Sequence, residues 1–443
     1  MISKWGVTNF KSIREVNLDL APLTIFTGVN SSGKSSFLDS ILLSSQFYDE
    51  NKEEEDESKK NETRFKLNSD NIKLGEAKHI FHNNSKQESI DCNFIIDEQF
   101  RKYRIEYSLM LYKPYSRNKE INTMRAEKIK GFSIEKNFDL EVEQEFEFDR
   151  EQAKEFLFNF FSPRNFSYLG PFRPSPQFSY IKQSDIKNKY VNSDGSNTFA
   201  VLKYWLHDKD DKNIIKCIPD NIEKMNYNSR EMDLFSTILN SWLKYFDLSD
   251  SCDVIPEPES KSDIRNLRPK SNTYNDKPEN EKFILSMNRK GKPYTLPQLG
   301  SGVSQILPIL TMCLIAPKNS TIIIKEPEAH FHPKVQSKLA DFFIAIALTG
   351  RQCLIETHSE YFIEQLRYHI VKHSDYKPEP LHKLTKLYFV TNKDEPSQFK
   401  NIEVDGNAML DEWPEDFFDE THITIWKIMK EIAKKEEKDR KNE

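Results

Sequence analysis

Residues 28–35 read Gly-Val-Asn-Ser-Ser-Gly-Lys-Ser and match the pattern GxxxxGK[ST]. They follow the apolar segment 23–27 and precede a helix expected over residues 36–45, the strand–loop–helix context in which this pattern binds phosphate. Backbone N–H groups of such a loop surround the β-phosphate, its lysine reaches the β/γ oxygens and its last hydroxyl ligates Mg²⁺. The sequence therefore predicts an α/β P-loop fold that binds nucleotide through Gly28, Asn30, Ser31, Ser32, Gly33, Lys34, Ser35 and Ser36.

Two more apolar segments end in ionisable residues. Residues 321–333 read Thr-Ile-Ile-Ile-Lys-Glu-Pro-Glu-Ala-His-Phe-His-Pro, a buried strand followed by acids that could serve Mg²⁺ or an attacking water. Residues 351–360 place His358 just after another short buried strand, where an imidazole could sense the γ-phosphate. The order and spacing of the motifs favour this role over a structural histidine.

Residues 299–305, Leu-Gly-Ser-Gly-Val-Ser-Gln, precede a long apolar segment expected to be a helix. Exposed N–H groups at a helix N-terminus suit an anion. An ordinary N-cap explains the small residues equally well, so the motif alone leaves both interpretations open.

Composition excludes several function classes. Against 70 acidic residues stand 64 basic ones, a net charge of −6, so DNA contact would need a local basic patch. The most apolar stretches, 303–317 and 342–348, are shorter than the ~20 residues that cross a bilayer, and no leader-like segment opens the sequence. Five cysteines lack CxxC spacing, which is typical of reduced thiols. We expect a cytoplasmic protein without a membrane partner.

Changes in pattern along the chain predict five segments. The acidic stretch 49–70 predicts a solvated loop, alternation within 89–148 predicts antiparallel strands, and the rhythm after residue 283 predicts a mainly parallel sheet covered by helices. The expected segments are the P-loop part of the nucleotide-binding head (1–48), an acidic loop and antiparallel β-subdomain (49–165), an inserted helical arm and flexible linker (166–282), the second part of the head (283–392) and a C-terminal extension (393–443).

The order of the four motifs resembles that of ABC-type ATPase heads. It is most similar to the branch shared by overcoming-lysogenization-defect (OLD) proteins and relatives of the structural-maintenance-of-chromosomes (SMC) ATPases, over residues 1–48 and about 283–392. Residues 413–419, Trp-Pro-Glu-Asp-Phe-Phe-Asp, look like an element of a bacterial subgroup. About 85 residues follow His358, and their acids do not resemble the clustered motifs of a Toprim nuclease domain.

The resemblance implies ATP and Mg²⁺ as cofactors and a homodimer or higher oligomer. Two heads would pair head-to-tail over two ATP molecules, with Ser301 and Gly302 of one protomer closing on the γ-phosphate held by Lys34 of the other. Ser35 is the expected metal ligand.

Three further residues receive roles from the resemblance. Phe10 would approach the adenine, Arg173 would act near the phosphates or a partner, and Gln46 would join Ser35 at the metal. Ordinary packing or surface exposure explains each of them at least as well.

One residue departs from the pattern of the resembled family. Where ABC-type heads place the Mg²⁺-coordinating carboxylate this chain has Lys325, directly before Glu326. In this register Glu326 is the catalytic base and Lys325 repels Mg²⁺ or replaces part of its charge, which would slow or abolish hydrolysis. In a shifted register Glu326 becomes the metal ligand and Glu328 the base. An introduced lysine that traps the ATP-bound state is a third alternative.

The resemblance implies an ATPase that acts as the sensor or regulatory subunit of a bacterial anti-phage defence assembly, with a separate nuclease or toxin as effector. Two alternatives belong to other classes. One is an SMC-like repair ATPase that clamps DNA, which would require a basic groove. The other is an ATP-gated scaffold without useful hydrolysis, which Lys325 favours.

Overall fold

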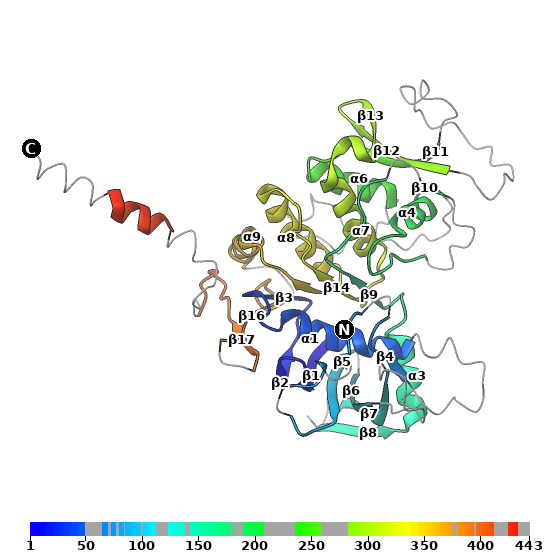
Figure 1. Cartoon of the computed structure of the whole chain (residues 1–443), viewed down its shortest axis with the longest axis vertical. Helices are drawn as coiled ribbons and strands as arrows, with labels where there is room; N and C mark the ends of the chain where they lie inside the picture. The colour runs from blue at the N-terminus through cyan, green and yellow to red at the C-terminus, as the bar shows by residue number, and fades with distance from the viewer. Residues whose placement is uncertain are drawn as a thin grey trace, which may run out of the picture.

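The computed structural model of the chain arranges its elements in three layers around a central sheet (Figure 1). The residues that it describes are 1–48, 64–69, 72–76, 79–83, 85–98, 101–111, 123–137, 142–177, 180–181, 189–207, 235–257, 282–374, 379–393, 396–411 and 424–432.

The central sheet has six strands in the order β17-β16-β3-β15-β14-β9, and every neighbouring pair is parallel except β16 with β17. Side chains on its two faces alternate, so that Ile322 and Ile324 enter one hydrophobic core and Ile323 enters the other. Both faces are apolar, as is typical of a parallel sheet covered on both sides. The strands are β3 (Leu23–Gly28), β9 (Phe166–Leu169), β14 (Thr321–Lys325), β15 (Gln352–Glu356), β16 (Thr385–Thr391) and β17 (Gln398–Ile402).

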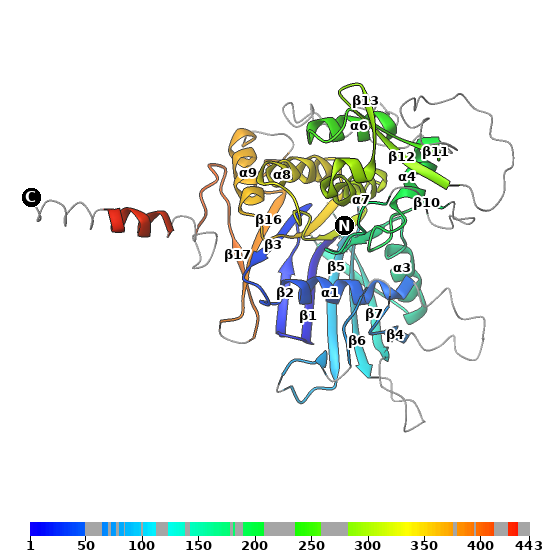
Figure 2. The same cartoon turned by 45° about the horizontal axis from the view of Figure 1, so that its top comes forward.

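Helices cover one face of this sheet (Figure 2). The apolar α7 (Ser301–Ile315), α8 (Pro333–Leu348) and α9 (Glu360–Lys372) pack there, in the part of the chain where the sequence predicts helices that cover a sheet. The same core contains residues of α4 (Thr198–His207), α6 (Phe235–Tyr245) and of a small antiparallel sheet. That sheet consists of β10 (Tyr180–Ile181), β11 (Ser251–Pro256), β12 (Lys282–Arg289) and β13 (Lys292–Thr295), and a short 3₁₀ helix, η4 (Leu296–Leu299), leads from it into α7.

The other face of the central sheet packs on α1 (Lys34–Ser44) and on a seven-stranded antiparallel sheet in the order β2-β1-β5-β6-β7-β4, with β8 beside β7. The four antiparallel strands expected within residues 89–148 are present as β5 to β8. Its elements are β1 (Ile2–Phe10), β2 (Ile13–Asp19), β4 (Arg64–Lys66), β5 (Ser89–Asp97), β6 (Lys102–Leu111), β7 (Thr123–Asn137) and β8 (Val142–Phe148), followed by α3 (Arg150–Phe160).

The structure confirms the α/β class, with a mainly parallel sheet and an antiparallel β-subdomain, and corrects three details. The subdomain includes β1 and β2, which precede the P-loop in the sequence. Part of the predicted acidic loop is strand β4, whose Phe65 is fully buried in the same core as α1. The predicted helical arm packs on α7 and belongs to the core that contains Ile322 and Ile324, here called the upper core. The core on the opposite face of the sheet, which contains Ile323, is called the lower core.

The C-terminal extension contains a helical segment over residues 424–432, and its apolar side chains are exposed. In both views it lies away from the sheets (Figures 1 and 2). The Trp413–Asp419 element and most of the linker 256–282 fall outside the described residues. Among the described helices, none is both long and apolar enough to span a membrane.

Candidate nucleotide site

The P-loop connects β3 to α1 at the carboxyl edge of the central sheet. Gly28 has φ 135°, and a Cβ there would lie 2.2 Å from the carbonyl oxygen of Val390 on β16. Gly33 has φ 109°, and a Cβ there would lie 2.3 Å from Oγ of Ser397. Both positions require glycine for sterics as well as for backbone conformation, so the neighbouring strand fixes the path of the loop.

Lys34 fills the inside of this loop. Its ammonium donates to the carbonyl oxygens of Gly28 at 3.1 Å and Val29 at 2.7 Å, and the side chain is buried. Burial lowers the pKa of Lys34, against the opposing charge of neighbouring carboxylates, the largest of which comes from Glu356. A phosphate group that enters the loop would offer this ammonium a stronger, charged acceptor than the two carbonyls.

Ser35, the next residue, contacts the end of strand β15. Its hydroxyl donates to Oε1 of Glu356 at 2.5 Å. The Glu356 side chain is 2% exposed, and its second oxygen, Oε2, has no hydrogen-bond partner among the described residues. Burial raises the pKa of Glu356, against the charge of Lys325 and the hydrogen bond from Ser35. A buried carboxylate oxygen without a hydrogen-bond partner among the described residues therefore lies on the side chain that binds the predicted metal-binding hydroxyl.

Lys325 ends the adjacent strand β14, in register with Glu356. Its ammonium lies 2.5 Å from Oδ1 of Asp39 on α1, and Lys11 holds the other oxygen of Asp39 at 2.8 Å. Burial opposes ionisation of Asp39, but the charges of Lys325 and Lys11 outweigh it and lower its pKa. Burial likewise opposes the charge of Lys325, and Asp39 reverses this and raises its pKa. The lysine is thus neutralised locally by α1.

The predicted base Glu326 and its neighbour Glu328 have different surroundings. Glu326 has a left-handed backbone, φ 47°, and is partly exposed at the edge of the sheet. Glu328 is buried, and its Oε1 accepts a hydrogen bond from the backbone N–H of His358 at 2.6 Å. Burial raises the pKa of Glu328, against this hydrogen bond. Strained positions concentrate at functional sites, and Glu326 is the acid free to face solvent or ligand.

His358 follows β15 on the same edge, with an exposed side chain. Partial desolvation and the charge of Lys34 lower its pKa, while Glu326 and the carbonyl of Gly28 favour its charged form. The structure therefore gathers Lys34, Ser35, Glu326 and His358 at one edge, as their positions after parallel strands lead one to expect.

The other predicted P-loop contacts divide by exposure. Asn30 and Ser31 are exposed, Ser36 is partly exposed and Ser32 is buried. A cavity of about 350 Å³ adjoins the loop, with Ser31 and Ser36 on one side. Its other lining residues are Lys11, Ser12, His79, Phe81, His82, Asn83 and Asn392.

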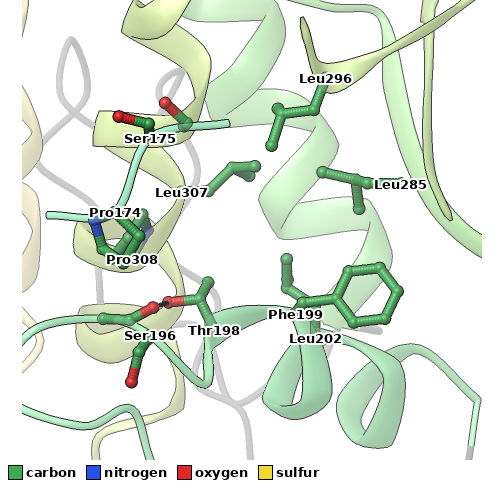
Figure 3. Close-up of a pocket in the computed structure, with 12 residues that line it drawn as sticks. Pro174, Ser175, Ser196, Thr198, Phe199, Leu202, Leu285, Leu296, Leu307 and Pro308 are labelled. Carbon is green, nitrogen blue, oxygen red and sulfur yellow. Dashed lines mark hydrogen bonds between the residues drawn. The ribbon is translucent and has the colours of Figure 1, made fainter. Parts of the chain in front are cut away.

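Ser301 and Gly302 open α7, where Ser301 is exposed and Gly302 partly so. A Cβ added at Gly302 would lie 3.9 Å from a ring carbon of Phe331, an ordinary van der Waals contact, and with Ser301 exposed the end of the helix faces solvent. Behind it a small apolar pocket of about 40 Å³ lies between α4, α7 and the segment after Arg173 (Figure 3). This volume is too small for a nucleotide.

Comparison with known proteins identifies the chain. A family model described as "AAA ATPase domain" matches residues 1–363. The chain belongs to this family. A second model, described as a protein of unknown function, matches residues 382–427. None of the curated proteins matches the chain.

Among solved structures the chain is similar to three SMC head domains. An SMC head bound to the C-terminal winged-helix domain of ScpA is 13% identical, covering 91% of this chain and 98% of that one, with a TM-score of 0.45. The head with an extended coiled coil bound to the C-terminal domain of ScpA, from Pyrococcus furiosus, is 12% identical, covering 98% and 99%, with a TM-score of 0.44. The Thermotoga maritima head is 11% identical, covering 91% and 99%, with a TM-score of 0.40.

An AAA ATPase domain implies nucleotide binding and typically Mg²⁺. The residues present fit that ion, since Ser35 and Glu356 supply the oxygen ligands that Mg²⁺ prefers, and one oxygen of Glu356 has no partner in the described ranges. Among the described residues no group of three or more His, Cys, Asp and Glu side chains forms a metal site by itself. Mg²⁺ characteristically completes its coordination with phosphate oxygens and water.

Two residues with predicted roles in this AAA ATPase make contacts of another kind in the structure. The amide of Gln46 donates to the carbonyl of Lys66 at 2.8 Å and accepts from its N–H at 2.7 Å, so in this structure its side chain anchors β4. Phe10 is fully buried in the lower core and presents no ring face to an adenine.

Arg173 lies near the predicted base. Its Nη2 donates to the carbonyl oxygens of Lys325 at 3.1 Å and Glu326 at 3.2 Å, whereas Nε and Nη1 are buried without a partner among the described residues. Burial lowers the pKa of Arg173 to about 10, against the charge of Glu328. Gln305 of α7 donates to the Arg173 carbonyl at 3.3 Å, so this residue connects α7 to the end of β14.

Two functional candidates escaped the sequence reasoning, Asp39 and Glu356. Asp39 lies four residues after Ser35, a spacing that places both on one face of α1. Glu356 is the one charged residue of the otherwise uncharged strand β15. These two sequence features could have drawn attention to the residues. Which side chains they contact depends on the order of the strands, which the structure shows.

Proposed function

We propose that this AAA ATPase is an ATP-dependent switch, which binds Mg²⁺-ATP at its P-loop and pairs head-to-tail with a second copy. The arrangement of Lys34 and Ser35 inside a loop fixed by β16 carries the first part of the proposal. The open N-terminus of α7 supports the second part, because its first N–H groups have no partner within the helix and suit a phosphate of the other copy.

Hydrolysis in this proposal uses Glu326 as the general base and His358 as the group that contacts the γ-phosphate. Glu326 is partly exposed, as a base that takes a proton from water must be. The lowered pKa of His358 favours a neutral imidazole, which can donate one hydrogen bond to phosphate. When bound, Mg²⁺ would neutralise charge on the phosphates.

The biological role follows from the motif resemblance to OLD-like ATPases. The chain would act in bacterial anti-phage defence as the sensor or regulatory subunit, with a separate nuclease or toxin as effector. ATP-dependent pairing would change the surface that the effector recognises, because a ligand shifts an equilibrium only through different affinities for its states. Co-purification with the products of neighbouring genes tests this role.

The test of the switch is the mass of the particle with and without Mg²⁺-ATP, measured by light scattering after gel filtration. The parent chain should dimerise with ATP, and Lys34→Ala should not, because it loses nucleotide. Ser301→Tyr should bind ATP but stay monomeric, since the new ring blocks the open helix end. Asn17→Tyr, a matched change at an exposed position of β2, should behave as the parent. Dimerisation of Ser301→Tyr with ATP would exclude the proposed pairing.

Lys325 favours one second candidate, an ATP-gated scaffold without useful turnover. It predicts that the parent binds ATP but releases phosphate no faster than Lys34→Ala. Turnover above that control would instead show that the lysine is accommodated.

A further inference from the structure

The end of β15 presents a carboxylate to the P-loop where the end of β14 cannot. Lys325 and Glu356 are register partners on adjacent parallel strands. Both lie on the face of the sheet that packs on α1 and the lower core, the same face as Ile323 and Leu354. Only Glu356 reaches Ser35, at 2.5 Å, while Lys325 reaches Asp39 one helical turn further along α1. The carboxylate nearest to the predicted metal ligand is therefore on the strand next to the expected one.

The charge of Lys325 does not oppose a cation beside Ser35 as strongly as the sequence suggests. Asp39 lies 2.5 Å from the Lys325 ammonium, and the pair is buried, with side chains 9% and 14% exposed. A close opposite charge cancels most of the field that a lysine would project at longer range. The net charge at the end of β14 is thereby reduced, while Lys325 still favours the ionised form of Glu356.

We propose that Glu356 is the carboxylate of the Mg²⁺ site of this ATPase and acts together with the Ser35 hydroxyl. This inference rests on the proposed binding of Mg²⁺-ATP. It assigns to β15 a task for which the sequence offered Glu326 or Glu328, the acids that follow β14.

The observed hydrogen bond is compatible with a bound cation. A serine hydroxyl has two lone pairs and one proton, so it can ligate a metal through oxygen and still donate its proton to Glu356. The second oxygen, Glu356 Oε2, has no partner among the described residues and is left for the cation or for one of its water ligands. The two lysines beside this buried acid, Lys325 and Lys34, both favour its ionised form.

The experiment measures ATP affinity by calorimetry, once with Mg²⁺ and once with EDTA, and follows the binding of Mn²⁺ in the presence of ATP by electron paramagnetic resonance. In Glu356→Gln the amide oxygen can still accept from Ser35, so ATP binding in EDTA should match the parent. The gain in affinity from Mg²⁺ and the binding of Mn²⁺ should fall on the order of ten- to a hundredfold, the range seen when a partner of a metal ligand is lost. Ser35→Ala, a change at an exposed position, removes the hydroxyl that binds Glu356. It should reduce the gain in ATP affinity from Mg²⁺ in the same way.

Glu326→Gln is the matched control, because it neutralises the neighbouring acid and leaves the Ser35–Glu356 pair intact. It should keep the Mg²⁺ gain and bind Mn²⁺ as the parent does. A full Mg²⁺ gain in Glu356→Gln or in Ser35→Ala would overturn the assignment, and so would loss of the gain in Glu326→Gln. A parent that binds ATP in EDTA no better than Lys34→Ala would refute the proposed function instead, and that titration separates the two failures.

Discussion

Strands β14 and β15 lie side by side, end at the same level and carry opposite charges at their last residues. Each contacts α1, Lys325 through Asp39 and Glu356 through Ser35, and the two helix residues are one turn apart on one face. In the β14 contact, Lys325 and Lys11 bind the two oxygens of Asp39. In the β15 contact, one oxygen of Glu356 has no hydrogen-bond partner within the part of the chain that the structure describes. The comparison indicates that the end of β14 stabilises the position of α1 through an ion pair, whereas the end of β15 can bind a ligand.

Exchange of the two charges should have the largest effect on this comparison. In Lys325→Glu combined with Glu356→Lys, Asp39 would face a carboxylate and Ser35 an ammonium, close to Lys34. Breaking a buried pair alone costs about 3–5 kcal/mol, a large part of the roughly 5–15 kcal/mol that a domain has. We expect little folded protein, measured by thermal unfolding. A variant that melts close to the parent and keeps its Mg²⁺ gain would mean that the two ends are interchangeable.

The two acids after β14 provide the next largest effect, on turnover. Glu326→Gln should lower the rate of ATP hydrolysis about 10²- to 10⁴-fold, the contribution of a general base, and leave ATP binding intact. Glu328→Gln should change the rate by only a small factor, because its oxygen serves the backbone of His358 and an amide oxygen can replace it. Phosphate release under saturating ATP measures both. The opposite ranking would select the shifted register, with Glu328 as the base.

Removal of the ion pair between Lys325 and Asp39 should destabilise the protein and leave the Ser35 hydroxyl in place. Asp39→Asn leaves Lys325 and Lys11 without their shared counter-charge and should lower the free energy of unfolding by about 3 kcal/mol. Urea denaturation measures the loss. The control is Asp19→Asn, whose pair with Lys4 is exposed and should change stability by at most about 0.5 kcal/mol. Equal effects of the two variants would show that the Lys325 pair is no stronger than a surface pair.

Much of this site could be predicted from the sequence, because its motifs are short and local. The P-loop, the two buried strands and His358 are recognisable from spacing alone, and parallel strands bring their ends together by geometry. The pairing of Ser35 with Glu356 could not be predicted. It depends on β15 lying between β3 and β14, an order that no local pattern specifies. The contact of Gln46 with the backbone of Lys66 could not be predicted either, because the sequence around Lys66 is rich in charged residues and does not indicate a strand.

The smallest expected effect is on the pH dependence of stability, where the two strand ends should have opposite signs. The pKa of Asp39 is lowered in the folded chain, so its contribution is complete above the unfolded value of about 3.9 and is lost as pH falls through the folded value. The pKa of Glu356 is raised, so its ionisation costs stability above the folded value, and the chain regains that stability as pH falls toward the unfolded value of about 4.3. At neutral pH, Glu356→Gln should therefore have a higher free energy of unfolding than the parent, and this difference should disappear in mild acid. The deficit of Asp39→Asn should persist through mild acid and shrink only below about pH 3.9. Parallel pH profiles for the two variants would show that the two carboxylates have pKa shifts in the same direction. That result would contradict the proposed difference between the ends of β14 and β15.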